Sequence, residues 1–545
     1  MRKSGRILLA ALVFGFFFVA CGVGWAAGAE PRYGGVLTWR LINEPPALDP
    51  AHSDITTSAR GTNLFCEPLV DLDDDGMQVV PALAESWDVN GDSTMWTLRL
   101  RKGVKFHKTA YKGEPTANGG RELTASDVKY SFERLIREKS ARAYFLNCIE
   151  GYQDYFDGKA KEWAGIQVVD DHTVRFTLSA PYAPFLAALS YTAYCIVPHE
   201  DAEKLGKDFN FRPVGTGPFV VYDWQHDNKV TFRRNPDYWM RDSAGRALPY
   251  LDGVELVVVP DSSVAYLEFR KGNLDVLSDV PTEFYDEISK NYKDRFQMRP
   301  TLVTQYYGMA VEKKPFDDVR VRRAINYAVN RKAINELVMS NVFIEGKGVL
   351  PPGMPGYNPD LKSYGYDPDK ARALLKEAGY EKGLSVTLQY NNNPRHKLIG
   401  EAVQAQFAEV GIKLELQSSE LGAHYDGVRR GDVPFFRAAW SADYPDPDNF
   451  LYNLFCSDNF GPKGNYARYK NDDVDEWLKE ARTISDPQRR VELYRKAEQQ
   501  IVDDAPWVFL FYDTTNLVAG PKLHDIKLSF IGEHNTSLTA VWKDE

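Results

Sequence analysis

The run of residues with the clearest potential for chemistry is an incomplete metal loop. The segment DLDDDG (71–76) matches the start of an EF-hand calcium loop, in which alternate carboxylates bind the ion. The twelfth position of such a loop needs a bidentate glutamate, and here it is Ala82. We therefore predict that this segment is a hairpin turn whose carboxylates face water.

Signatures of catalysis are missing or incomplete in the same way. His199-Glu200 lacks the second histidine of the HExxH zinc motif, and the sequence contains no GxSxG elbow and no Walker loop. The segment GTGP (215–218) lacks the third glycine of a phosphate loop and predicts a tight turn before a strand. The sequence thus predicts a protein that is not an enzyme and that holds no metal or cofactor. A glycosidase-type carboxylate pair stays open, because the chain has 76 acidic residues.

Composition and charge narrow the class of protein. The chain has 545 residues, of which 43% are hydrophobic and 26% are charged, and its net charge is −10. These values are typical of a folded globular protein with roughly two to four domains of about 150 residues each. The negative balance excludes nucleic acid as the main ligand, because phosphate binding needs a basic face.

The first segment predicts export. Basic residues within 2–6 precede an apolar run at 7–20, and the small residues AGA (27–29) fit a signal-peptide cleavage site. Removal of residues 1–29 would take away three basic groups and change the net charge from −10 to −13. The segment FVAC (18–21) also resembles a lipobox, which would place a lipid anchor on Cys21. We expect a periplasmic protein that is free or tethered by this lipid.

Four cysteines remain after cleavage, and none of them forms a CxxC pair. Their spacing leaves zero, one or two disulfides open in an oxidising compartment. They are Cys66, Cys148, Cys195 and Cys456.

Hydrophobic periodicity predicts a mixed α/β chain. Alternation favours strands at 36–41, 94–100 and 229–234 and a hairpin at 167–178, and Thr124 with Asp127 forms a capping pattern before a helix. In the second half, apolar residues from 321 to 338 fall on one helical face, and residues 367–379 carry helix start and stop signals. The order strand–helix–strand at 384–416 predicts a parallel βαβ unit.

Eight stretches, in order along the chain, together resemble one known family, the family 5 extracellular solute-binding proteins of ABC transporters, of the oligopeptide- and dipeptide-binding type. The stretches span nearly the whole chain after residue 29. They are NEPPALDP (43–50), PALAESW (81–87), WTLRLRKGVKFH (96–107), LTASDV (123–128), GTGPF (215–219), RNPDYW (234–239), DVRVRRA (318–324) and WSADYPDPDNF (440–450).

This resemblance implies an α/β protein of the two-lobed periplasmic-binding-protein type II fold, with a small domain inserted in the first lobe. The lobes would close over the ligand about a hinge. The implied division is 1–29 signal peptide; 30–66, 193–303 and 510–545 first lobe; 67–192 small domain; and 304–509 second lobe.

The resemblance also implies the site. Asp443 would pair with the ammonium of a peptide, and Arg437 lies in the ligand cavity of such proteins and would meet carboxylates. Trp440 and Tyr444 would line side-chain pockets, and the loop with Asp54 and Ile55 would offer backbone hydrogen bonds as an added strand.

The implied function is capture of short peptides by a monomer, with delivery to the permease and ATPase subunits of an inner-membrane ABC importer. The alternative is a binder of the same fold for an oligosaccharide, a nickel chelate, haem or an opine, and an exported hydrolase is a third class. The flanking acids Asp446 and Asp448 could favour a cationic ligand.

Overall fold

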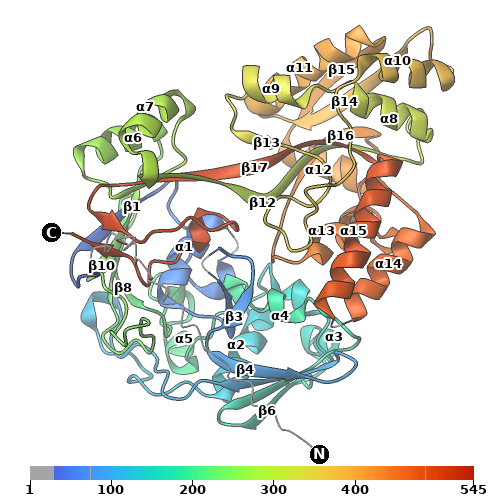
Figure 1. Ribbon diagram of the computed structural model, residues 1–545. Helices are drawn as coiled ribbons and strands as arrows, with labels where there is room; N and C mark the ends of the chain where they lie inside the picture. Colours follow the sequence, from blue (N-terminus) through green and yellow to red (C-terminus); the bar gives the residue numbers. More distant parts are fainter. Residues whose placement is uncertain (1–29, 54, 74, 485, 545) are drawn as a thin grey trace, which may run out of the picture.

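The computed structural model describes residues 30–544 apart from 54, 74 and 485. It is a mixed α/β molecule in which two large parts are joined along one extended sheet (Figure 1). The first part contains β1 (Val36–Leu41), the second part contains β14 (Leu384–Asn391), and a third part with β5 (Met95–Leu100) packs below. The predicted signal peptide, the cysteine proposed for lipidation and Asp54 lie outside the described residues.

One large mixed sheet runs through both main parts. Its strand order is β15-β14-β16-β12-β17-β11-β1-β10-β9-β8, and β13 pairs with β17 beside this path. The strands are β1 (Val36–Leu41), β8 (Phe219–Gln225), β9 (Lys229–Arg234), β10 (Gly253–Val258), β11 (Val276–Ser278), β12 (Phe296–Met309), β13 (Phe343–Glu345), β14 (Leu384–Asn391), β15 (Ile412–Ser419), β16 (Phe435–Ser441) and β17 (Trp507–Ala519).

The long strands β12 and β17 connect the two main parts (Figure 1). They are antiparallel, and the register shifts between Pro300 and Thr304 and again between Gln305 and Tyr306. At one end β17 pairs with β11 of the first part, and beyond the shift β12 pairs with β16 of the second. Every chain connection between the two halves of the sheet therefore uses these two strands.

A separate antiparallel sheet builds the third part. Its order is β4-β5-β7-β6, and the helix α2 (Ala125–Arg137) packs on it. The strands are β4 (Ala84–Val89), β5 (Met95–Leu100), β6 (Ile166–Asp170) and β7 (Thr173–Thr177). Two further hairpin pairs are β2 (Val70–Leu72) with β3 (Val79–Pro81) and β18 (Leu523–His524) with β19 (Trp542–Lys543).

Helices cover the sheets, and those of the second part are the longest. None of the helices in the described residues is long and apolar enough to cross a membrane. The others are α1 (Thr56–Phe65), α3 (Tyr152–Phe156), α4 (Phe185–Ala188), α5 (His199–Leu205), α6 (Ser262–Lys271), α7 (Tyr285–Asn291), α8 (Val319–Tyr327), α9 (Arg331–Leu337), α10 (Pro368–Glu377), α11 (Pro394–Glu409), α12 (Leu421–Arg430), α13 (Pro447–Phe455), α14 (Asp472–Thr483) and α15 (Pro487–Asp504).

The apolar side chains form several separate cores within the parts. One cluster fills the third part around Phe132 and Phe176, and a second lies under the first part around Trp39 and Phe232. The second part has two clusters, one on each face of its sheet. Polar and aromatic contacts both cross the seams between the parts, as where Phe145 packs edge-on against Tyr444. The candidate site lies on this seam.

Local sequence signals match the structure where they are strong. Thr124 and Asp127 form the predicted capping box of α2, and Asp367 caps α10 with its side chain on the N–H of Lys370. The strands β14 and β15 are parallel, as the βαβ pattern predicts. The metal-like segment 71–76 belongs to the β2–β3 hairpin, which confirms the turn predicted there.

One local expectation was wrong, and the structure also shows which of the disulfide alternatives left open by the cysteine spacing it has, which is none. The single helical face expected from 321 to 338 is broken into α8 and α9, because Asn330 begins a new helix by accepting the N–H of Ala333. As a result Leu337 is 84% exposed. The four cysteines expected in the mature chain are all free thiols in this structure, and burial raises the pKa of Cys148 to about 12.

Candidate functional site

The candidate site begins where β16 ends. Ser441 is the last strand residue, and the chain then turns through Asp443 into α13. Asp446 caps that helix by accepting the N–H of Asp448, and Pro447 occupies its first turn. Asx capping followed by proline at the first helical position fixes this turn locally.

The flanking acids of this turn are already paired. Both carboxylate oxygens of Asp446 lie 2.9 Å from one guanidinium nitrogen of Arg490. Oδ1 of Asp448 lies 2.9 Å from Nε of Arg482. Asp448 is fully buried, and burial raises its pKa to about 6. The suggestion that these two acids attract a cationic ligand was therefore wrong, because their negative charges are already paired with Arg490 and Arg482, which hold the turn.

Asp443 lies at the seam between the second and third parts. Its Oδ1 is 3.1 Å from the guanidinium of Arg142, and its Oδ2 accepts a hydrogen bond from Asn449 at 3.3 Å. Its side chain is 17% exposed, and burial raises the pKa of this carboxyl while Arg142 lowers it. Asp443 is thus a largely buried carboxylate that is held next to one cation.

Trp440 and Tyr444 are positioned by the same turn. The indole N–H of Trp440 donates to Oδ1 of Asn449 at 2.9 Å, the residue that also bonds Asp443. The hydroxyl of Tyr444 lies 2.8 Å from that of Tyr182 in the third part, and Tyr444 is only 4% exposed. Both aromatic side chains therefore pack around Asp443 and the seam.

Arg437 lies on the other face of β16 from Trp440. Side chains alternate between the two faces of a strand, so residues an odd number apart point in opposite directions. The guanidinium of Arg437 donates to Oε1 of Gln305 at 3.0 Å, and the amide of Gln305 donates to Asp513 at 2.5 Å. Burial lowers the pKa of Arg437 and raises that of Asp513. This is a second buried polar cluster, on β12, β16 and β17.

Two histidines neighbour this cluster, and sequence reasoning did not select them. Nε2 of His424 lies 2.8 Å from the carbonyl of Arg437, and burial together with the Arg437 charge lowers the pKa of His396 to about 4. Nδ1 of His396 and Nδ1 of His424 are both buried, and neither has a hydrogen-bond partner among the described residues. Such buried polar atoms cost free energy unless another group satisfies them.

A cavity of about 170 Å³ adjoins Asp443. Asp443 and Ile55 both line it, so the structure brings these two predicted residues together, whereas Arg437, Trp440 and Tyr444 are outside its lining. Residues that the sequence did not single out complete the walls, because they come from distant segments. They include Ala59, Arg142, Tyr191, Thr192, His534 and Asn535.

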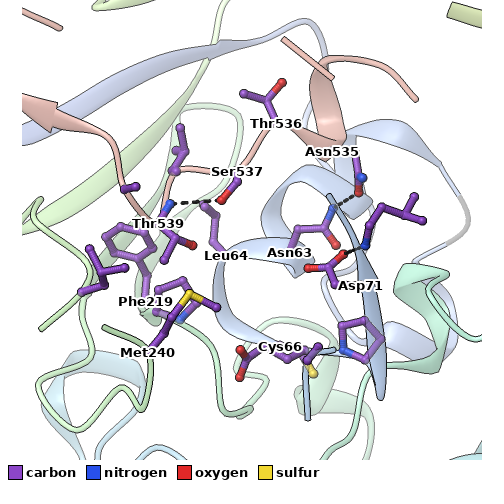
Figure 2. Close-up of a pocket in the computed structure, with 18 of the residues that line it drawn as sticks. Asn63, Leu64, Cys66, Asp71, Phe219, Met240, Asn535, Thr536, Ser537 and Thr539 are labelled. Carbon is purple, nitrogen blue, oxygen red and sulfur yellow. Dashed lines mark hydrogen bonds between the residues drawn. The ribbon is translucent and has the colours of Figure 1, made fainter. Parts of the chain in front are cut away.

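A second cavity of about 280 Å³ lies next to the first (Figure 2). The two share Leu72, Ser190 and Asn535 in their linings. Figure 2 shows Asn63 bonded to Asn535 at its edge, with an Nδ2 to Oδ1 distance of 3.2 Å, and Asp71 on the same side. The two cavities therefore meet at the wall formed by α1 and the C-terminal segment.

Glu67, one of the three acids in the lining of this second cavity, has a structural role. The carboxylate of Glu67 accepts hydrogen bonds from Thr216 at 2.6 Å, Tyr238 at 2.9 Å and Trp239 at 3.0 Å. Burial raises its pKa to about 7 despite these donors. Glu67 therefore ties the chain after α1 to the strands of the first part.

Comparison with known proteins places this arrangement in a family. The model of the bacterial extracellular solute-binding proteins, family 5, matches residues 78–462. The dipeptide-binding protein of Escherichia coli strain K12 is 33% identical over 98% of both chains. The unliganded open form of the periplasmic murein tripeptide binding protein MppA superposes with a TM-score of 0.81 and 26% identity over 94% of this chain and 97% of that one.

A second solved structure contains a ligand. The periplasmic binding protein DppA of Helicobacter pylori, in complex with the peptide STSA, superposes with a TM-score of 0.72 and 30% identity, over 94% of this chain and 99% of that chain. The residues that the family model matches include the turn at Asp443. The chain belongs to the bacterial extracellular solute-binding proteins, family 5.

Proposed function

We propose that this protein captures short peptides between its two main parts and delivers them to an ABC importer. The observation that carries the proposal is Asp443, a largely buried carboxylate beside a cavity, which pairs across a seam with the guanidinium of Arg142. Of the relatives named above, one is a dipeptide-binding protein and another was solved with a peptide, which supports the same class of ligand.

The chemistry of a peptide fits the two buried polar clusters. A free peptide carries an ammonium at one end and a carboxylate at the other, and leaving either charge buried and unpaired costs several kcal/mol. We propose that Asp443 meets the ammonium and that Arg437 meets a carboxylate, with Gln305 orienting the guanidinium at 3.0 Å. Trp440 and Tyr444 would then provide the aromatic surroundings of Asp443.

The main chain of the peptide would be held by the loop before α1. Ile55 is extended, with φ −122° and ψ 157°, so its peptide groups are arranged as in a strand. An extended ligand can pair with such a segment through backbone hydrogen bonds, which do not depend on the ligand's side chains. We propose the loop with Asp54 and Ile55 as this segment, which implies tolerance of many sequences.

Closure would occur by bending of β12 and β17. We propose 30–66, 193–303 and 510–545 as the first lobe, 67–192 as the small domain and 304–509 as the second lobe. The register shift between Pro300 and Thr304 lies at the proposed boundary, and such irregularities are places where strands bend. Hinge closure around a ligand would then bring Arg437 and Asp443 toward the loop before α1.

The cellular setting follows from the same proposal. We propose an exported monomer, carried out by a signal peptide at 1–29 and free in the periplasm or anchored through Cys21. Its partners would be the permease and ATPase subunits in the inner membrane. The named relatives are binding proteins, and we expect one ligand bound per chain with no turnover.

Native mass spectrometry of the purified protein, followed by denaturation and identification of what is released, tests the ligand class. Peptides of narrow length are expected. A sugar, a metal chelate or haem would contradict the peptide proposal and leave the family membership unchanged.

The role of Asp443 has its own test, which uses refolded ligand-free protein and the peptides just identified. Asp443→Asn should weaken binding at least a hundredfold, because breaking a buried ion pair costs roughly 3–5 kcal/mol and 1.4 kcal/mol is tenfold in affinity. The matched control is Asp458→Asn, whose carboxylate is half-exposed and pairs with Lys479 on the surface. Equal affinities for Asp443→Asn and wild type would remove the ammonium role.

A further inference from the structure

Two cysteines that the proposed function does not use flank the segment 67–192, which we propose as the small domain. Cys66 directly follows α1, and Cys195 directly follows the short 3-10 turn Thr192–Tyr194. The chain therefore enters the small domain just after one cysteine and leaves it just before the other. We call these two chain crossings, with Cys66 on one and Cys195 on the other, the neck of the small domain.

The two crossings of the neck are hydrogen-bonded to each other. The N–H of Ile196 donates to the carbonyl of Glu67 at 3.0 Å, and the thiol of Cys66 donates to the carbonyl of Ile196 at 3.3 Å. The thiols of Cys66 and Cys195 are themselves in hydrogen-bond contact. Each cysteine is only 2% exposed, and both belong to the core of the first part. Backbone bonds and packing therefore hold the two sulfur atoms side by side.

The other two cysteines of the described chain lie in different cores. Cys148 packs against the core of the third part, and Cys456 is buried in the second part. A disulfide requires Cβ atoms about 3.5–4.5 Å apart, which two thiols in hydrogen-bond contact can reach by a small movement. Cys148 and Cys456 would have to leave their cores to meet each other or the neck. The geometry therefore favours one pairing.

We propose that Cys66 and Cys195 are a redox pair, which a disulfide oxidant converts into a cross-link across the neck of the small domain. The thiolate of one cysteine attacks a sulfur of the oxidant and forms a mixed disulfide, and the thiolate of the other then displaces the oxidant's remaining half. One S–S bond breaks in the oxidant and one forms in the protein. The two cysteines lose two protons and two electrons, and the oxidant leaves as two thiols.

The burial of the pair determines when the cross-link forms. Both sulfurs are thiols in this structure, and burial raises the pKa of Cys195, whereas the thiolate is the form that reacts. We therefore expect the bond to form during folding, before the neck is packed. An oxidising compartment, such as the periplasm that we propose, supplies disulfide oxidants.

The cross-link would close a loop that contains the whole small domain. Disulfides that close long loops stabilise a protein mainly by restricting its unfolded chain. The same domain presents Tyr182 to the turn at Asp443, where its hydroxyl lies 2.8 Å from that of Tyr444. A closed neck would therefore fix the base of the domain that packs against the candidate site.

Refolding in a glutathione buffer tests the pairing. Denatured and reduced protein is refolded with reduced and oxidised glutathione, its free thiols are alkylated in denaturant, and its proteolytic peptides are identified by mass spectrometry. The peptides of Cys66 and Cys195 should be recovered joined and two hydrogen atoms lighter than their sum, while those of Cys148 and Cys456 carry the alkyl group. Alkylation of Cys66 and Cys195, or a link between any other two cysteines, would overturn the proposal.

A variant that carries both Cys148→Ala and Cys456→Ala removes the competing thiols of the described chain. It should form the same link. If this variant refolds with reductant alone but not with oxidised glutathione, the cross-link is incompatible with the fold and the proposal fails. Peptide capture is unaffected by either result, because the neck is not among the residues proposed to hold the ligand.

The stabilising effect has a separate measurement. Addition of reductant should lower the melting temperature of the oxidised wild-type protein by roughly 3–5 °C, as expected for a loop of this length in a chain of this size. Cys195→Ala should show no such shift, and the matched control Cys148→Ala should keep it. An equal shift in Cys195→Ala would overturn the stabilising role of the neck pair.

Discussion

The pair between Arg142 and Asp443 makes a prediction about stability that needs no ligand. The two residues are 301 positions apart, and they join segment 67–192 to segment 304–509. At 3.1 Å and an effective dielectric of about 20, the direct attraction is roughly 5 kcal/mol. Partial solvent access and the roughly 2 kcal/mol of rotamer entropy of an arginine side chain oppose it, so we expect a net coupling of about 1–3 kcal/mol.

A double-mutant cycle measures this coupling. The four proteins are wild type, Arg142→Gln, Asp443→Asn and the double variant, each unfolded and refolded to remove ligand and then unfolded in urea. Each single variant should lose stability, and the double variant should lose less than the sum of the two. The cycle isolates the pair because residues in contact are expected to deviate from additivity.

The control cycle uses Arg270 and Glu287, whose charged atoms are 3.6 Å apart and half-exposed. Exposed pairs couple by about 0.2–1 kcal/mol, so this cycle sets the lower end of the scale. If the effects of Arg142→Gln and Asp443→Asn add to within 0.5 kcal/mol, the seam is not held by this pair. The inference that Arg142 holds the Asp443 carboxylate at the seam would then be refuted.

Three further predictions concern the surrounding fold. Burial raises the pKa of Glu498 to about 7, above its unfolded value near 4.5. Its protonated form therefore adds stability below pH 4.5, and this stability is lost as the pH rises to 7. The variant Glu498→Gln should remove about 3 kcal/mol of this pH dependence, measured by urea unfolding at pH 5 and 8. Gly217→Ala should destabilise by about 1–3 kcal/mol, since its Cβ would lie 2.6 Å from the carbonyl carbon of Phe65; an unchanged melting temperature would contradict this. Arg490→Ala should weaken peptide binding by loosening Asp446, and calorimetry should show no loss if the turn is held otherwise.

Local signals explain the parts of the fold that were predictable. The capping box at Thr124 and Asp127, the cap at Asp367 and the parallel unit at 384–416 depend on residues that are close in sequence. Capping and periodicity are short-range effects, so they can be read without knowing the fold. The break between α8 and α9 escaped prediction because Asn330 interrupts an apolar pattern that continues on both sides of it.

The candidate site also has features that are set locally in the sequence and features that depend on tertiary contacts. The turn from 440 to 450 is determined locally, because Asp446 and Pro447 begin α13 and thereby place Asp443 at the end of β16. The pairing of Asp446 with Arg490, 44 positions away, is a tertiary contact, which is why these acids were misread as free to attract a ligand.

The sequence alone predicted an export signal, carried the family resemblance and placed Asp443 and Arg437 in the chain. Only the tertiary structure decided what surrounds them. Arg142 reaches Asp443 from 301 positions away, and the first residues of α1 close the same cavity from the other end of the chain. The physical reason is that charge pairing between distant segments leaves no periodic or spacing signal, since it depends on how separately folded parts pack against one another.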